Sequence, residues 1–409
     1  MGLFGRSSRV KYGAIIDIGS GSVLAAIVAS DQTKAEPEVV WFKREYVPLR
    51  SDSSLKDTAK SVMTSLLNVL MLLNKDGKHQ LYEKYGRQKL TDLQVSISAP
   101  WSYTVTKSIT YNKDRPFELT PDLITELQRT AHTKVEAELK ENETMHNLGL
   151  TIISRSILAI IANGYNVKSL NRQRAENLKI VESNAVAQNY LLDNLMEVKD
   201  KILPESKPQF YSFILLFYYI VRHFHPDTSE VGLIDITYEA TEIGIVRDGV
   251  LTYCTHTPVG GASLARELSA CLEVPLAEAL AFLKEPILEE WLGNFSSAKQ
   301  AAARKAFVDY TERLRSAFGE TGDTLAIPKK IYLHGNLGSE KFFQTIIKTA
   351  AEAATKSTHH IHTISDSLPL YHVQPDGEIS SVRPKPDASL FISAQFFHTN
   401  ELRSRFEQL

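Results

Sequence analysis

The stretch that decides the fold is Tyr12-Gly-Ala-Ile-Ile-Asp-Ile-Gly-Ser-Gly-Ser-Val-Leu-Ala-Ala-Ile-Val-Ala29, in which two apolar runs flank four small residues. This pattern predicts a hairpin of two buried strands joined by a tight turn, and residues 39–48 can add a third strand. From Lys56 to Asn74, valine and leucine recur at helical intervals, which predicts a helix after the strands. The chain therefore opens on a β-β-β-α unit.

The same unit recurs in the second half of the chain. Its parts are two apolar runs, a turn and a further strand: residues 231–236, residues 242–246, the turn Arg247-Asp-Gly249 and residues 250–255. Residues 12–75 and 231–284 thus look like two copies of one plan. A long-range repeat of this kind predicts an α/β fold with two related lobes that face one another.

Each hairpin carries an acidic residue at the end of its first strand. The two motifs read Asp17-Ile-Gly-Ser-Gly-Ser-Val23 and Asp235-Ile-Thr-Tyr-Glu-Ala-Thr241. Small residues after such a carboxylate leave backbone N–H groups and hydroxyls within reach of phosphate oxygens, while the carboxylate can hold a hydrated Mg²⁺. Two facing loops would place both carboxylates around one Mg-triphosphate. Taken alone, each loop also fits an ordinary hairpin turn.

Two more stretches of small residues follow the second hairpin, Pro258-Val-Gly-Gly-Ala262 and Leu333-His-Gly-Asn-Leu-Gly338. Their glycines would allow a ligand to approach the backbone closely. With all these motifs in this order, the chain resembles the actin-like ATPase superfamily, and within it the bacterial FtsA/PilM branch. The resemblance covers nearly the whole chain, and the Met-Gly-Leu-Phe start is similar to that of many PilM-like proteins.

The resemblance implies a two-lobed, ribonuclease H-like α/β ATPase fold with an inserted α+β subdomain. The segments expected are residues 1–92 and 184–230 for the first lobe, 93–183 for the insertion, 231–380 for the second lobe, and 381–409 for a closing segment or amphipathic helix. Within the insertion, the strand at residues 93–99 is expected to pair with the strand at 104–111.

For the site, the resemblance implies ATP and Mg²⁺. Asp17 and Asp235 would hold the Mg²⁺ and orient the attacking water, since phosphoryl transfer depends on positioning and charge stabilisation. The residues expected around the nucleotide are Gly19, Ser20, Gly21, Ser22, Thr237, Thr241, Gly260, Gly261, Lys284, Gly335 and Asn336.

The chain also departs from the family. Members usually carry glycines in the second phosphate motif, where this chain has Thr237, Tyr238 and Glu239. The Cβ of Thr237 and the charge of Glu239 would then lie near the phosphates. The glutamate that usually precedes the base-proximal lysine, here Lys284, by three positions is Ala281. We therefore expect nucleotide binding with at most weak ATPase activity. An interaction module that has lost nucleotide and a small-molecule kinase of the same fold are the alternatives.

The resemblance implies a scaffold at the inner face of the plasma membrane, as FtsA is in cell division and PilM in type IV pilus assembly. The partners expected are further copies of the chain, the cytoplasmic tail of a membrane protein, or another division or pilus protein, with residues 93–183 as the interface. Residues 390–409 are partly amphipathic, so they fit either a peripheral membrane helix or a helix that closes the last domain.

Composition narrows the setting. With 43% hydrophobic and 23% charged residues the chain is typical of folded globular proteins, and 46 Lys and Arg against 48 Asp and Glu, without a basic block, argue against nucleic acid. Cys254 and Cys271 lack the spacing of a disulfide framework or thiolate metal site, which favours the cytoplasm. His359 would not share a strand face with His360 and His362, so a loop and strand entry is favoured over a metal site.

Overall fold

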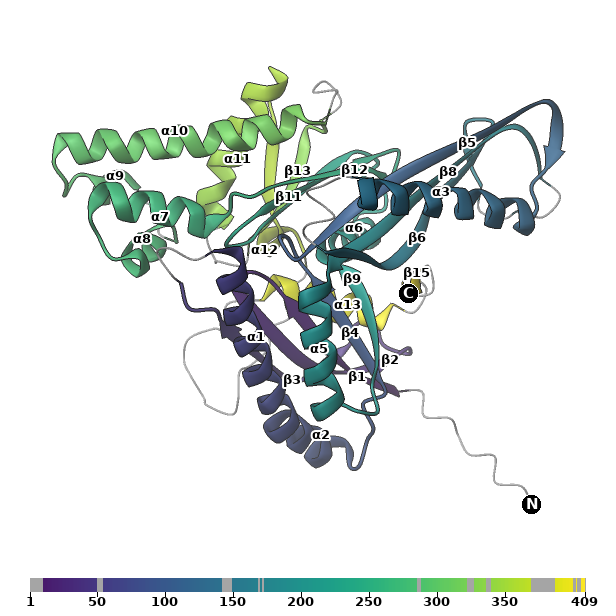
Figure 1. Ribbon diagram of the computed structural model, residues 1–409, viewed down its shortest axis with the longest axis horizontal. Coiled ribbons are helices and arrows are strands. Elements are labelled where there is room, and N and C mark those ends of the chain that lie inside the picture. The colour runs from purple at the N-terminus through teal and green to yellow at the C-terminus, as the bar shows by residue number, and fades with distance from the viewer. Residues whose placement is uncertain are drawn as a thin grey trace.

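The computed structural model describes residues 10–49, 54–141, 149–167, 170, 173–284, 288–321, 327–335, 340–368, 387–399, 402 and 406–408. Three β-sheets organise these residues, two in the stacked lobes and one in an arm that extends to the side (Figure 1). The α/β class and the two-lobed plan predicted from the sequence are confirmed.

The first sheet has the strand order β3-β2-β1-β4-β9. Its strands are β1 (Val10–Ile18), β2 (Ser22–Asp31), β3 (Glu38–Tyr46), β4 (Asp92–Ile97) and β9 (Lys207–Ser212). The first three are antiparallel, whereas β4 runs parallel to both β1 and β9. The predicted hairpin and third strand are therefore confirmed. The helices of this lobe are α1 (Leu55–Leu72), the π-helical turn η1 (Leu73–Gly77), α2 (Lys78–Tyr85) and α5 (Asn189–Ile202).

The second sheet repeats this topology in the order β12-β11-β10-β13-β14, which confirms the internal repeat. Its strands are β10 (Val231–Ile236), β11 (Thr241–Arg247), β12 (Val250–Thr257), β13 (Lys330–Gly335) and β14 (His360–Thr363). The helices of this lobe are α7 (Gly261–Leu272), α8 (Leu276–Phe282), α9 (Leu288–Leu292), α10 (Ser297–Gly319), α11 (Glu340–Thr355) and α12 (Ile364–Ser367).

The third sheet is antiparallel and forms the arm, in the order β15-β6-β8-β5 with β7 also paired to β6. Its strands are β5 (Ser102–Glu118), β6 (Leu150–Ala162), β7 (Tyr165–Asn166), β8 (Arg174–Gln188) and β15 (Phe406–Gln408), and α3 (Pro121–Glu141) packs on it. One prediction is wrong: the strand at 93–99 does not pair with 104–111. As β4 it joins β1 and β9, because its partners in a parallel sheet are distant in sequence.

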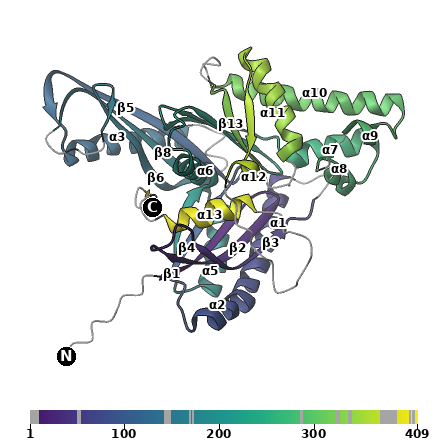
Figure 2. The ribbon, with the colours of Figure 1, turned by 180° about the vertical axis from the view of Figure 1, so that it is seen from behind.

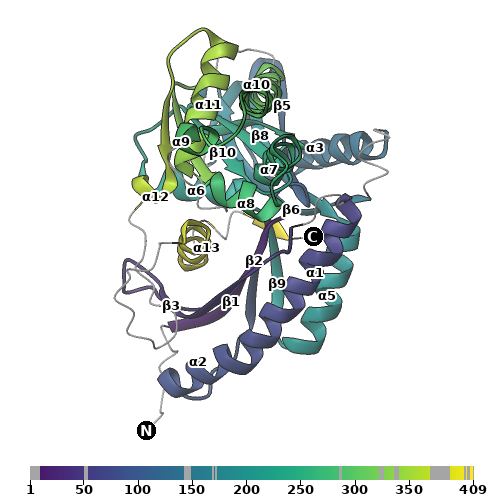
Figure 3. The same ribbon diagram turned by 90° about the vertical axis from the view of Figure 1, so that its left-hand side faces the viewer.

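Two helices lie between the lobes, α6 (Phe213–Phe224) and α13 (Ala388–His398) (Figure 3). Every residue of α13 is buried, so this segment is the helix that closes the fold and not an amphipathic surface helix. Seen from behind, α13 crosses the face of the first sheet opposite to α1 (Figure 2). Among the described residues, no helix is long and apolar enough to cross a membrane.

The contact between α13 and the first sheet is close. Leu390, Ala394 and Phe397 form one buried cluster with Ile15 and Leu24 of the hairpin. Fully burying a side chain the size of leucine or phenylalanine stabilises a fold by about 1.5–3 kcal/mol, so this helix is part of the core of the first lobe. The chain thus returns at its end to the lobe where it began.

Candidate functional site

The two acidic hairpins face each other, as the sequence predicts, and they are in direct contact. The hydroxyl of Ser20 donates a hydrogen bond to the hydroxyl of Thr237 (3.0 Å). The backbone N–H of Glu239 donates to the Ser20 hydroxyl, also at 3.0 Å. Donors that a phosphate loop would offer to a ligand are therefore satisfied between the loops themselves.

The side chain of Tyr238 fills the space beside the first loop. A Cβ atom placed on Gly21 would lie 2.0 Å from a carbon of the Tyr238 ring, which is far inside van der Waals contact. Tyr238 is only 5% exposed, and its burial raises the pKa of the phenol to about 12. Gly21 thus makes room for a side chain of the opposite lobe.

The other small residues also serve contacts within the protein. The N–H groups of Gly261 and Ala262, at the start of α7, donate to the carbonyls of Thr237 (2.8 Å) and Tyr238 (2.9 Å). A Cβ on Gly260 would lie 2.5 Å from the Thr237 carbonyl oxygen. The helix N-terminus, which often binds anions, is here aimed at the second loop.

Polar groups of the hairpins continue this pattern. The Gly19 N–H donates to the Ser22 carbonyl (3.0 Å), and the Thr241 hydroxyl donates to the Val259 carbonyl (2.8 Å). Glu239 forms an ion pair with Arg266 of α7, with one N–O distance of 2.9 Å. The negative charge that we expected near the phosphates is therefore paired with a cation of its own lobe.

Asp17 is buried and lies close to a cation. Its Oδ1 accepts a 2.8 Å hydrogen bond from Ser96, and its Oδ2 lies 3.9 Å from a guanidinium nitrogen of Arg44. Burial raises the pKa of Asp17, although the Arg44 charge opposes that rise. Arg44 also donates to Ser22 at 2.7 Å. Sequence reasoning missed Arg44, one of two adjacent cations on β3.

Asp235 is fully buried beside His334 of β13, with 2.7 Å between Oδ1 and Nδ1. Its Oδ2 has no hydrogen-bond partner among the described residues. Glu242, its neighbour on β11, accepts a bond from the Thr104 N–H at 3.3 Å. Burial, with the nearby charge of Asp235, raises the pKa of Glu242 well above its ordinary value.

The sequence also predicted Lys284, Gly335 and Asn336 near the nucleotide. Lys284 is exposed in the turn after α8, and Gly335 is the last residue of β13. Asn336 lies outside the described residues.

The histidine cluster is divided, as predicted. His359 is buried against Thr355 and the Pro328 carbonyl, whereas His360 and His362 are exposed on β14. Within the described part of the chain, no group of three His, Cys, Asp or Glu side chains is placed to hold a metal ion.

This arrangement does not fit Mg-ATP. The Tyr238 ring occupies the space over Gly21, and the Ser20 hydroxyl and the Glu239 N–H bind each other.

A groove lies elsewhere, between the arm and the first lobe. Its volume is about 700 Å³, and α3, β6 and α5 contribute to its wall. Apolar lining comes from Leu139, Leu150, Ile152, Ile153, Leu192, Met196 and Phe210, and polar lining from Glu136, Lys140, Arg155 and Asn189. The side chain of Arg155 is mostly buried, lies 3.2 Å from Glu136, and has an Nε atom without a partner among the described residues. Sequence reasoning proposed residues 93–183 as an interface but did not locate this groove.

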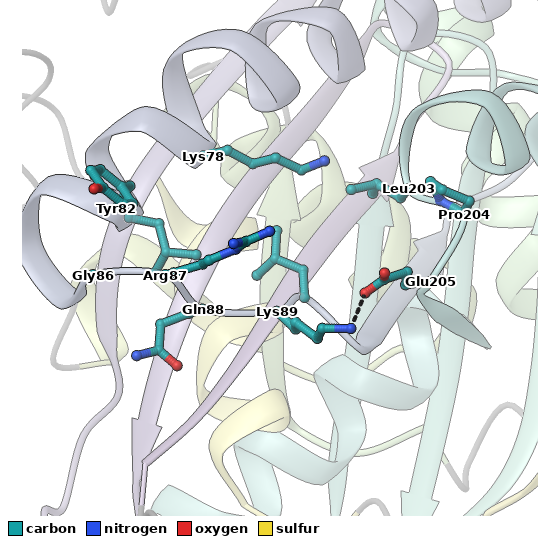
Figure 4. Close-up of a pocket in the computed structure, with 11 residues that line it drawn as sticks. Lys78, Tyr82, Gly86, Arg87, Gln88, Lys89, Leu203, Pro204 and Glu205 are labelled. Atoms are coloured by element: carbon teal, nitrogen blue, oxygen red, sulfur yellow. Dashed lines mark ion pairs between the residues drawn. The ribbon is translucent and has the colours of Figure 1, made fainter.

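A smaller pocket of about 430 Å³ lies at the far end of the first lobe, next to α2 (Figure 4). Lys78, Arg87 and Lys89 line it, with Glu205 paired to Lys89 at 3.1 Å. Burial lowers the pKa of Lys78. This pocket has no counterpart among the residues predicted from the sequence.

No protein-family model and no curated protein sequence matches the chain. Solved structures do match. The PilM-PilN type IV pilus biogenesis complex aligns with a TM-score of 0.53 and 13% identity over 86% of this chain and 87% of that one. The ethanolamine utilization protein EutJ from Carboxydothermus hydrogenoformans aligns with a TM-score of 0.43 and 11% identity, over 94% and 90% of the two chains.

A protein of unknown function with an actin-like ATPase fold, from Bacteroides thetaiotaomicron, aligns with a TM-score of 0.43 and 9% identity, over 96% and 99% of the chains. The likeness to the PilM-containing complex is one of fold. The class of this protein is therefore defined by architecture: it has the actin-like ATPase fold, two ribonuclease H-like lobes with an inserted antiparallel sheet.

Proposed function

We propose that this protein is an actin-like interaction module that works with its lobes closed on each other and without bound nucleotide. The observation that carries the proposal is the direct contact between the two hairpin loops, through the Ser20–Thr237 hydrogen bond and the packing of Tyr238 on Gly21. In this proposal the actin-like fold provides binding surfaces for other proteins, and the protein does not act as an enzyme.

The partner proposed is an extended segment of another protein, bound in the groove between the arm and the first lobe. Peptide-sized apolar grooves with a few charged groups suit such ligands, since the apolar wall contributes affinity and the charges fix orientation. The similar PilM-PilN structure is a complex of two proteins, which supports a protein partner. By the resemblance to the FtsA/PilM branch, the segment would be the cytoplasmic tail of a membrane protein of a pilus or division machine.

Calorimetry with Mg-ATP tests the proposal that the protein does not bind nucleotide. We expect no binding heat for the wild type. The triple variant Thr237→Gly, Tyr238→Gly and Glu239→Gly restores the glycines usual in the family, and we expect it to bind Mg-ATP. Adding Asp17→Asn to that variant should abolish the binding. Binding by the wild type at micromolar concentration would overturn the proposal.

One observation favours a second function, an ATP-switched scaffold. The buried Oδ2 of Asp235 has no partner among the described residues, and carboxylates at the ends of facing strands are what a Mg-nucleotide requires. In that case the lobes would have to separate before ATP enters, and Asp17, Asp235 and the glycines of the loops would hold it. Self-assembly, the other prediction from the resemblance, is measured by sedimentation of the wild type with and without Mg-ATP.

A further inference from the structure

Residues 406–408 form an edge strand of the arm. In β15, Phe406, Glu407 and Gln408 pair antiparallel with Ser156, Arg155 and Ser154 of β6. The last described residue before this strand is Leu402, which is buried in the core below the arm. A segment beyond the closing helix α13 therefore reaches across to a different sheet.

This strand is short for a stable sheet element. Strands in globular proteins usually have about five or six residues, and β15 has three. An edge strand held by so few pairs gains little against the backbone entropy it loses. Its covalent link to α13 compensates, because a short tether supplies an effective concentration on the order of millimolar. Such a strand is held in place by its connection more than by its contacts.

The edge that β15 covers belongs to the groove described above. Ile152, Ile153 and Arg155 line the groove, and Ser154 to Ser156 are the residues that pair with β15. The hydroxyl of Ser154 is buried without a hydrogen-bond partner among the described residues. One stretch of β6 thus offers backbone hydrogen bonds along its edge and side-chain surface beside it, which is the combination used in recognition by strand addition.

We infer that the C-terminal strand is a built-in competitor for the partner's strand on β6. This inference rests on the proposed function, since it concerns the same groove. The β6 edge accepts an extended peptide segment of the partner. The chain's own C-terminal strand occupies this edge until the partner's segment displaces it. A tail docked in about nine-tenths of the molecules weakens the apparent affinity for the external strand about tenfold.

The test uses the tail itself as the probe. A chain that ends at Leu402 keeps α13 and the buried Leu402 and loses only residues 403–409. A labelled peptide of residues 403–409 is titrated with this shortened chain and with the full chain, and binding is followed by fluorescence anisotropy. A peptide with Phe406→Pro, Glu407→Pro and Gln408→Pro, which has no N–H to donate in the strand, is the matched control.

We expect the peptide to bind the shortened chain at least about tenfold more tightly than the full chain, and the proline peptide to bind neither. Amide hydrogen exchange at residues 154–156 should be faster in the shortened chain and slow again when the peptide is added. If the peptide bound both chains with equal affinity, the inference that the C-terminal strand competes would be wrong, and the β6 edge would still be an acceptor for a partner's strand. Binding to neither chain would overturn the inference, whereas the calorimetric test of nucleotide is unaffected by either result.

Discussion

Arg44 on β3 donates two hydrogen bonds of 2.8 Å each to the carboxylate of Asp387, the residue that caps the N-terminus of α13. The two residues are 343 positions apart, and their side chains are 10% and 21% exposed. Asp387 also accepts the N–H of Leu390, as an N-cap does. Burial opposes the charge on each partner, but their attraction prevails, so the pKa of Arg44 is raised and that of Asp387 is lowered.

The first prediction is that Arg44→Met lowers the free energy of unfolding by about 3 kcal/mol, because it leaves the largely buried charge of Asp387 without its partner. The double variant Arg44→Met with Asp387→Asn should recover part of that loss, since asparagine can still cap the helix. Urea unfolding measures both. Lys60→Met, which removes the cation of the exposed Lys60–Asp57 pair, is the control and should change stability by less than about 1 kcal/mol. Equal losses in the single and double variants would contradict this account.

The second prediction concerns the contact between Tyr238 and Gly21. Gly21→Ala adds a methyl group where the Tyr238 ring lies, and overpacking of this kind costs about 1–3 kcal/mol. In a Tyr238→Ala background the same change should cost much less, because the ring is gone, and a double-mutant cycle in thermal or urea unfolding measures the difference. Gly319→Ala, at a glycine in α10 with open space around it, is the matched control and should not destabilise. Additive losses at 21 and 238 would count against the packing described here.

The third prediction is a pH dependence carried by Glu242. Its raised pKa means that the folded state keeps the proton above pH 4.5, where the unfolded carboxyl has lost it. Folding then binds a proton, so the stability contributed falls as the pH rises, by about 1.4 kcal/mol per pH unit over the interval between the two pKa values. Glu242→Gln removes this dependence while its side-chain carbonyl can still accept the Thr104 N–H. The advantage of the variant over the wild type should therefore grow from pH 5 to pH 8 in urea unfolding.

In this experiment the free energy of unfolding of each variant is compared with that of the wild type at the same pH. Asp387 provides the opposite sign, since its lowered pKa gives stability that is present above its ordinary value of 3.8 and lost as the pH falls below it. Asp387→Asn should thus cost most near neutral pH and little in acid. A stability difference for Glu242→Gln that is the same at pH 5 and pH 8 would show that the carboxyl is charged in the folded protein.

Much of the architecture could be predicted because it is written in local patterns. The apolar runs around Asp17 and Asp235 gave both hairpins, and their similarity gave the repeat of the two lobes. The position of β4 could not be predicted, because alternation identifies a strand but not its neighbour, and its partners β1 and β9 are parallel and distant. The same limit applies to β15, whose pairing with β6 has no local signal.

The site shows a different limit. Glycines and hydroxyls after an acidic residue are the pattern of a phosphate loop, yet the same residues allow two loops to pack against each other, as Gly21 does with Tyr238. The departure at Thr237, Tyr238 and Glu239 was visible in the sequence, and it indicated reduced turnover. Its structural meaning depends on which lobe the tyrosine ring enters, and on Arg266 taking up the charge of Glu239, neither of which spacing reveals.

The position of α13 has a consequence for how the protein is made. Ile15 and Leu24 enter a growing chain near its start, but the residues that cover them, Leu390 and Phe397, are synthesised near its end. One apolar face of the first sheet therefore stays uncovered while the arm and the second lobe are synthesised. During that time the nascent chain is exposed to aggregation, and a ribosome that stops before residue 388 releases a product that cannot complete its first lobe.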